Sequence, residues 1–352
     1  MAHGIYNKAR DFQIAESIAW HKLTQVKVPE MIDFPEIVPV PLYHGDNKVA
    51  SYGSSRYFLP VSTDDGIAVA PPYCGETLLD NEEKGCNDIR EKRGSYVLFT
   101  PREAWAWVGE LLAGTGFKVA SIGMLWNRSF WFIGTELTEL KSLSIGDGRE
   151  AKFLLNFSGG LDRTVSPQCE LSNILPVCHN TISLSRASGK ILFKDRATKN
   201  FSDRLELAKG EVEKAVGMTA VFKASMDSIA KVPCTPDRAE RVFAGFLSTD
   251  NDKKLSTRTK NAVHELTDLH TSGLGNKGET EFDLLNAYTQ RLTRGGMDSK
   301  ISEGRRFASG EFGSNADAKA EFYNLLTNRD SSGSRPKLEI CEQRGERILE
   351  AV

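Results

Sequence analysis

The chain of 352 residues lacks several patterns that would assign a protein to a class directly. It has no apolar run of about 18 residues that could span a bilayer, and its first residues carry no apolar core of a secretory signal. We therefore expect a cytoplasmic protein without membrane contact. It also has no G-x-x-x-x-G-K-[ST] segment, which argues against an ATP-driven motor and predicts no nucleotide cofactor.

Cysteine is scarce and scattered, with six residues and no C-x-x-C pair. This spacing indicates neither a structural zinc site nor a disulfide framework, so we expect reduced, mostly packed thiols. Cys178 and His179 are neighbours, but adjacent side chains point in different directions and cannot form a hydrogen-bonded catalytic pair with each other. We predict no catalytic residue.

Neither sign of charge is in excess, because 45 basic and 47 acidic residues leave a net charge of −2. The protein is not a polycation, so any nucleic-acid site must be a local basic surface. A hydrophobic content of 40% is enough for the core of one large domain or of two intertwined ones.

The first hundred residues predict an arm followed by paired strands. Residues 1–35 read as an N-terminal arm with a short helix from Ala9 to Ala19, able to pack on a neighbouring subunit. Short apolar runs between Ile37 and Val61, separated by Gly-containing turns, predict paired strands. The polar stretch from Asp64 to Gly94 predicts a long loop.

A capping box predicts the best-defined helix of the chain. Thr100 can cap it, Pro101 suits its first position, Glu103 completes the box, and Gly114 can end it. The apolar face that we predict for this helix comprises Ala104, Trp105, Val108, Leu111 and Leu112.

Strand patterns dominate the middle of the chain. Phe117 to Met124 and Ser129 to Leu137 predict a β-hairpin, and Ala151 to Phe157 with Arg163 to Gln168 predict a second. A strand at Lys190 to Phe193 and a long helix from Phe201 to Val232 are expected to follow, in that order.

After Pro233 the apolar residues recur at helical spacing. The predicted helices are Pro236 to Leu247, Ser256 to Leu269, Glu281 to Leu292 and Asn315 to Thr327. Gly273 to Gly278 fits G-x-G-x-x-G but follows a helix, so we interpret it as a loop. The fold class is α+β, with antiparallel β-hairpins packed with a long helix and followed by a helical C-terminal subdomain. The domains are an arm (1–35), an α+β core (36–232), a helical subdomain (233–330), and a linker with a short C-terminal helix (331–352).

The first predicted hairpin combines cations with flat rings, which could hold phosphates and stack unpaired bases. These residues are Lys118, Trp126, Arg128, Phe130, Trp131 and Phe132. Because side chains alternate along a strand, we expect one face of Phe130–Ile133 to be core and the other exposed. The alternative is an ordinary core strand.

A second basic group spreads over the next strand, its loop and the start of the long helix. It comprises Arg186, Lys190, Lys194, Arg196, Lys199 and Arg204. Such a stripe can follow a sugar–phosphate backbone, aided by the helix N-terminus. The alternative is a solvated face, since Asp195, Asp203 and Glu206 lie among these cations.

Acidic residues gather in the predicted loop between residues 64 and 94. They are Asp64, Asp65, Glu76, Asp80, Glu82, Glu83 and Asp88. Metal-assisted hydrolysis of nucleic acid needs converging carboxylates, so this loop carries a nuclease hypothesis. Their spacing matches no known ligand pattern, and a solvated loop is the alternative; we predict no metal site.

Four segments, taken in order, resemble a family of phages and plasmids catalogued as Domain of Unknown Function 932. They are Met1-Ala2-His3 with Ala19-Trp20-His21-Lys22-Leu23, then Arg56 to Val61, Leu175 to Leu184, and Asn286-Ala287-Tyr288-Thr289. Ala19 and Lys22 stand where the family opening has Pro and Gly. The family name implies no activity.

The predicted order of elements is similar, by architecture, to phage single-strand annealing recombinases. That resemblance implies a ring or filament of identical subunits that holds extended single-stranded DNA without ATP, for recombination of a mobile element in a bacterial host cell. We therefore predict a single-stranded-DNA-binding and annealing protein, with host or phage replication proteins as further partners. The predicted contacts are Trp126, Arg128, Trp131, Arg186, Lys190, Lys194, Arg196, Lys199 and Arg204. A metal-dependent nuclease and a host-interaction adaptor that binds no nucleic acid remain the alternatives.

Overall fold

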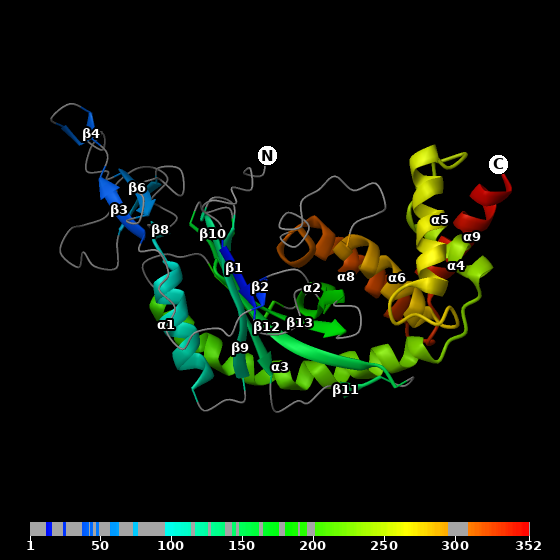
Figure 1. Ribbon diagram of the computed structural model, residues 1–352, viewed down its shortest axis with the longest axis horizontal. Helices are drawn as coiled ribbons and strands as arrows, with labels where there is room; N and C mark the ends of the chain where they lie inside the picture. Colours follow the sequence, from blue (N-terminus) through cyan, green and yellow to red (C-terminus); the bar gives the residue numbers. More distant parts are fainter. Residues whose placement is uncertain are drawn as a thin grey trace. The chain divides into compact units, whose positions relative to one another are not determined.

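A computed structural model describes most of the second half of the chain and parts of the first (Figure 1). The described residues are 12–15, 24–25, 37–41, 43–44, 47–48, 57–62, 73–76, 96–113, 117–125, 128–137, 143–145, 148–161, 165–175, 180–188, 191–195, 201–294 and 309–351. They fall into two compact units. Unit 1 is 1–139, 154–170 and 191–215, and unit 2 is 140–153, 171–190 and 216–352. This division differs from the predicted domain boundaries.

The main sheet has nine described strands, in the order β14-β13-β12-β10-β9-β1-β2, with β11 beside β12 and β15 beside β13. The strands are β1 (Phe12–Ala15), β2 (Thr24–Gln25), β9 (Phe117–Leu125), β10 (Phe130–Leu137), β11 (Leu143–Ser144), β12 (Glu150–Gly160), β13 (Gln168–Leu175), β14 (Asn180–Ser183) and β15 (Phe193–Lys194). β9 and β10 pair antiparallel, with Ile133 opposite Ile122, which confirms the first predicted hairpin. The α+β class is also confirmed.

Smaller sheets form from strands between residues 37 and 97. β3 (Ile37–Pro41) pairs antiparallel with β6 (Tyr57–Ser62), as the alternating runs predicted. On its other side β6 pairs with β7 (Tyr73–Glu76), and β7 pairs with β8 (Tyr96–Val97). β4 (Tyr43–His44) pairs with β5 (Asn47–Lys48) in a separate sheet. The strand β7 lies inside the stretch predicted as a loop, whose other residues are outside the described ones.

The helix predicted from Ala9 to Ala19 is wrong over its described part. Phe12 to Ala15 form β1, which pairs antiparallel with β9 and places Ile14 opposite Ile122. A short helix on its own is marginal in water, whereas a sheet edge offers a complete set of backbone partners. Pairing with β9 therefore outweighs the helical spacing.

Helix α1 (Pro101–Leu112) begins at the predicted capping box. The Thr100 side chain accepts a bond from the Glu103 amide at 3.2 Å, and the Glu103 carboxylate accepts one from the Thr100 amide at 2.6 Å. The sequence missed Trp107, whose ring meets Phe157 of β12 edge-on at 5.4 Å between centroids. This contact packs α1 against the sheet within unit 1.

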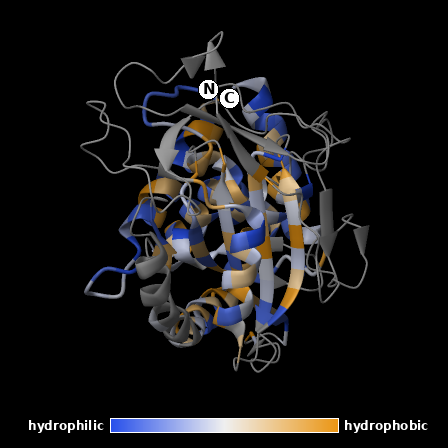
Figure 2. Cartoon of the chain, turned by 90° about the vertical axis from the view of Figure 1, so that its left-hand side faces the viewer, coloured by the Kyte–Doolittle hydropathy of each residue, from blue (hydrophilic) through white to orange (hydrophobic). Residues whose placement is uncertain are grey.

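Both faces of β10 are buried, so the expectation of one exposed face is wrong. Phe130, Trp131, Phe132 and Ile133 are each at most 2% exposed. β10 lies between β9 and β12, and Figure 2 shows hydrophobic bands along the strands of this sheet. A strand covered on both faces carries a continuous apolar run, which is the pattern of residues 130–133.

The second predicted hairpin is only partly correct: its first strand forms as β12, whereas its second strand, Arg163 to Gln168, coincides with β13 at Gln168 alone. β12 continues to Gly160, through residues predicted as the turn, because they pair with the start of β10. A side chain at Gly159 would lie 2.6 Å from the Trp131 ring, so a glycine is needed there. The next strand begins at Gln168 and not at Arg163.

Helices form most of unit 2, and the four predicted after Pro233 are confirmed. They are α4 (Pro236–Phe246), α5 (Thr257–Ser272), α6 (Glu281–Arg294) and α8 (Ser314–Thr327). The long helix α3 (Phe201–Ala230) is also confirmed and passes from unit 1 into unit 2. A short helix that was not predicted, α2 (Leu184–Ser188), follows β14.

The C-terminal helix α9 (Pro336–Glu350) has fifteen residues and packs against α4, which also contacts α5 (Figure 1). The two backbones of α4 and α9 touch at a pair of glycines. A Cβ on Gly245 would lie 1.8 Å from the Cys341 carbonyl oxygen, and one on Gly345 would lie 1.9 Å from that of Arg241. The helix that was predicted to be short and to follow a linker is therefore part of the core of unit 2.

We expect Gly345→Ala to lower the free energy of unfolding by about 2–3 kcal/mol, because the added methyl group forces α4 and α9 apart. Urea unfolding followed by circular dichroism measures this. Gly217→Ala in α3 is the matched control, since its Cβ would meet nothing within 4 Å. The free energy of unfolding of the control should rise by about 0.5–1 kcal/mol, because alanine has a higher helix propensity than glycine. Equal effects of the two substitutions would contradict the close crossing.

Candidate functional site

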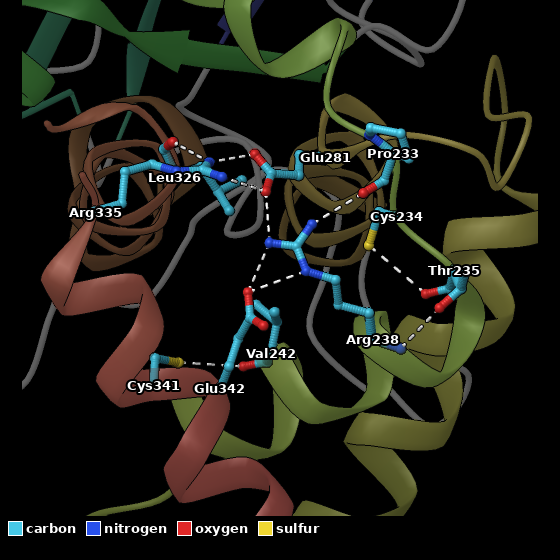
Figure 3. Close-up of polar contacts among 10 residues, drawn as sticks. All are labelled: Pro233, Cys234, Thr235, Arg238, Val242, Glu281, Leu326, Arg335, Cys341 and Glu342. Atoms are coloured by element: carbon cyan, nitrogen blue, oxygen red, sulfur yellow. Dashed lines mark hydrogen bonds and ion pairs between the residues drawn. The ribbon is translucent and has the colours of Figure 1, made fainter. Parts of the chain in front are cut away.

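A buried carboxylate, Glu281 at the start of α6, joins three parts of unit 2 (Figure 3). Its side chain is 0% exposed and pairs with Arg238 of α4 at 2.7 Å and with Arg335, the residue before α9. Arg238 also reaches Glu342 of α9 at 2.7 Å and the Pro233 carbonyl at 3.0 Å. A buried carboxylate is tolerated only when it is paired and hydrogen-bonded. The network therefore fixes how α4, α6 and α9 meet.

Asp283, two residues after Glu281 in α6, holds the glycine-containing loop that precedes this helix. It accepts bonds from the amides of Glu279 at 2.9 Å and Thr280 at 3.0 Å and pairs with Arg149 at 2.6 Å. Burial alone would raise the pKa of Asp283, but these amide bonds and the arginine outweigh it and lower the pKa. The ionised form is thus the one that the fold stabilises.

The Asn286-Ala287-Tyr288-Thr289 segment also has a structural role. Asn286 donates to the Leu274 carbonyl at 2.9 Å and to the Asn276 side chain at 2.6 Å. Tyr288 packs on Phe322 at 4.5 Å between ring centroids. The G-x-G-x-x-G stretch is a loop, as predicted.

A pocket of about 720 Å³ lies in unit 2. Facing stripes of α8 and α9 line it, together with α2 and the end of α4. The lining residues are Arg186, Phe246, Ser248, Asp317, Ala320, Glu321, Asn324, Leu325, Asn328, Lys337, Ile340, Cys341 and Arg344. Its wall thus depends on the position of α9, which the Glu281 network sets.

Three cations reach this pocket. Arg186 pairs with Asp317 at 2.7 Å, and Arg344 pairs with Asp250 at 2.7 Å while donating to the carbonyls of Gly245 and Ser248, each at 3.1 Å. The side chains of the two aspartates are 67% and 76% exposed, so these surface ion pairs contribute little to stability. Lys337 is exposed. The pocket lining also contains the exposed carboxylates of Asp317 and Glu321, with which an incoming anion must compete for these cations.

Apolar and amide groups complete the pocket. Ile340 is 55% exposed, and Phe246 and Leu325 are partly exposed. Asn324 donates from Nδ2 to the Ala187 carbonyl at 2.7 Å, which fixes the orientation of its amide. The pocket therefore offers positive charge, an apolar wall and hydrogen-bonding groups together.

Of the predicted nucleic-acid contacts that lie in the described ranges, Arg186 lines this pocket. Trp131 belongs to the core, and its burial leaves no ring surface for a base, so we withdraw it. Lys194 is exposed on β15, and Arg128 is a partly exposed turn residue with a φ of 66°. Trp126, Lys190, Arg196, Lys199 and the side chain of Arg204 lie outside the described residues.

Sequence reasoning missed Lys337 and Arg344, because residues 331–352 were interpreted as a linker and a short helix. A signal was present. Lys337, Ile340, Cys341 and Arg344 recur at i, i+3, i+4 and i+7, which places them on one face of a helix.

The described residues give no support to thiol or metal chemistry. Burial raises the pKa of Cys234 and of Cys341 to about 12, so both stay protonated.

No three His, Cys, Asp or Glu side chains in the described ranges are grouped as a metal site. Of the acidic loop only Glu76 is described, and Cys178 and His179 lie outside. No described helix has the length and apolar character needed to cross a membrane.

We expect Glu281→Gln to lower the free energy of unfolding by about 3 kcal/mol, because it leaves Arg238 and Arg335 without their shared counter-charge. Asp268→Asn in α5 is the control, since that carboxylate is exposed, and it should change the value by less than about 0.5 kcal/mol. Urea unfolding measures both. A loss no larger than that of the control would show that the network does not hold the helices.

Asp283 should contribute a pH-dependent part of the stability. Its folded-state pKa is below the unfolded value of about 3.9, so its contribution is complete above that pH and is lost as pH falls through the folded-state pKa. The difference in unfolding free energy between the wild type and Asp283→Asn should therefore shrink as pH falls below about 4. Urea titrations across this range measure it. A difference that stays constant with pH would contradict the assignment.

A comparison with protein families identifies one match, to the family described as Domain of unknown function (DUF932), over residues 90–326. No curated protein and no solved structure matches the chain. The matched residues run from the segment before α1 through α8, including the Glu281 and Asp283 sites, and stop before α9. Because the match covers well over half of its length, the chain belongs to the DUF932 family.

Proposed function

We propose that this protein is an ATP-independent, oligomeric single-stranded-DNA-binding and annealing protein of a phage or plasmid. The observation that carries the proposal is the pocket of unit 2, where Arg186, Lys337 and Arg344 come together beside an apolar wall. Proteins that hold single strands combine cations for the phosphates with flat or apolar surfaces for the bases.

The mixed lining favours a single strand over a duplex. In a duplex the bases are stacked and paired, so only phosphates and groove edges are presented, and an apolar wall within a pocket gains nothing. A single strand can insert a base. The apolar side chains Ile340 and Leu325 then lose water contact at the moment of binding.

The remaining predicted residues are proposed as further contacts, and Lys194 among them is exposed. The proposed phosphate contacts are Arg128, Lys190, Lys194, Arg196, Lys199 and Arg204, and Trp126 is proposed to stack a base. The hairpin and the long helix α3 are the elements that the resemblance to annealing recombinases requires. We propose a ring or filament of identical subunits in the cytoplasm of the host.

A second candidate is an adaptor that binds a host or phage replication protein. The 55% exposure of Ile340 favours it, because an exposed aliphatic side chain in a pocket also suits a protein partner. Retention of a protein partner without any affinity for DNA would favour the adaptor. A nuclease using the acidic loop is not supported by any described group of residues.

The salt dependence of binding tests the proposal. A labelled oligonucleotide of about 40 nucleotides should bind at low salt. The negative slope of log affinity against log salt should become shallower by about 0.7 in Lys337→Ala, because one phosphate contact is lost. Fluorescence anisotropy at several salt concentrations measures the slope. Lys260→Ala in α5 is the matched control, since this exposed lysine is not among the pocket residues.

The control should keep the parental slope. A parental slope in Lys337→Ala would remove this pocket from the binding path, and a wild-type protein that ignores the oligonucleotide at low salt would contradict the proposed function itself.

A further inference from the structure

Two helix faces, one on α8 and one on α9, form most of the pocket. On α9 the lining residues fall at i, i+3, i+4 and i+7, and on α8 they continue over three turns, from Asp317 to Asn328. The opposite side of α8, with Phe322 and Leu326, is buried in the core. The volume of about 720 Å³ is in the range of small-molecule and cofactor sites. It is too small for a folded domain and large enough for a nucleotide.

The two cations of α9 differ in how they are held. The guanidinium of Arg344 is tied to the Gly245 and Ser248 carbonyls and to Asp250, so its direction is fixed. Lys337 has no hydrogen-bond or ion-pair partner within the described part of the chain and keeps its full capacity to bind an anion. A phosphate here would meet one oriented and one adaptable cation.

The apolar wall consists of a ring held by its neighbours, Phe246, and an exposed aliphatic side chain, Ile340. Phe246 is held by edge-on contacts with Tyr288 at 5.4 Å and Phe322 at 4.8 Å between centroids. Ile340 is the most exposed aliphatic side chain of the pocket. A flat base placed over Ile340 would cover the surface that water now touches.

Two amides can meet the polar edge of such a base. Asn324 uses its Nδ2 for the Ala187 carbonyl, so its oxygen is the group presented as an acceptor. Asn328 follows α8 directly and is exposed. Charge, wall and amides thus match the phosphate, face and edge of one nucleotide.

We infer that this pocket binds a single unstacked nucleotide of the strand, with its base over Ile340, its edge at Asn324 and Asn328, and its phosphate at Lys337 and Arg344. The inference rests on the proposed function and specifies how the strand is held. The site grips the strand through one base per subunit in addition to the backbone charge.

The test compares two oligonucleotides of equal length and charge, one with normal bases and one whose sugars carry no base. The wild type should bind the base-bearing strand about tenfold more tightly, because the base then removes the apolar surface of Ile340 from water. Ile340→Ala should reduce this ratio several-fold and leave the salt slope unchanged, since it removes no charge. Anisotropy titrations at fixed salt measure the ratio.

Val221→Ala in α3 is the matched control, because Val221 is 70% exposed and lies outside the pocket. It should keep the wild-type ratio. Both positions are exposed, so neither substitution is expected to unfold the protein, and circular dichroism checks this. An unchanged ratio in Ile340→Ala, with DNA binding intact, overturns the inference and leaves the proposed function standing. Absence of binding to both strands by the wild type overturns the proposed function as well.

Discussion

The buried pairing of Glu281 with Arg238 and Arg335 is the interaction on which the helical unit depends. Removing a carboxylate from water is costly, and the two arginines offset that cost for Glu281, whose side chain is 0% exposed. Because the partners come from α4 and from the start of α9, the charge also fixes the register of these helices. The glycine crossing of α4 and α9 then allows the close approach. The pocket wall on α9 follows from both constraints.

The fold could be predicted where local signals and tertiary packing agree. The capping box at Thr100 and the apolar stripes after Pro233 define helices that the structure reproduces within a few residues. Local signals failed where pairing partners decide the outcome. Residues 12–15 form a strand because β9 offers its edge, and Ser158 to Gly160 stay in β12 because β10 continues beside them. Neither partner is visible in the local sequence.

The candidate site was predicted less well than the fold, for a physical reason. Arg186 was identified from its place in a basic stretch, but Lys337 and Arg344 lie about 150 residues away and meet it only through the packing of α8 and α9. Trp131 shows the opposite error, since cations and rings near a hairpin indicate a binding surface only if the rings are exposed. Burial on both faces of a strand depends on what covers the sheet. A motif cannot supply that information.

We propose that the protein assembles and takes up single-stranded DNA through phosphate contacts. Light scattering coupled to size-exclusion chromatography, with and without a labelled oligonucleotide of about 40 nucleotides at low and at high salt, measures both properties together. We expect an assembly larger than one chain of 38.9 kDa that carries the oligonucleotide at low salt and releases it at high salt. A monomer that elutes apart from the oligonucleotide at low salt would show that the proposal is wrong.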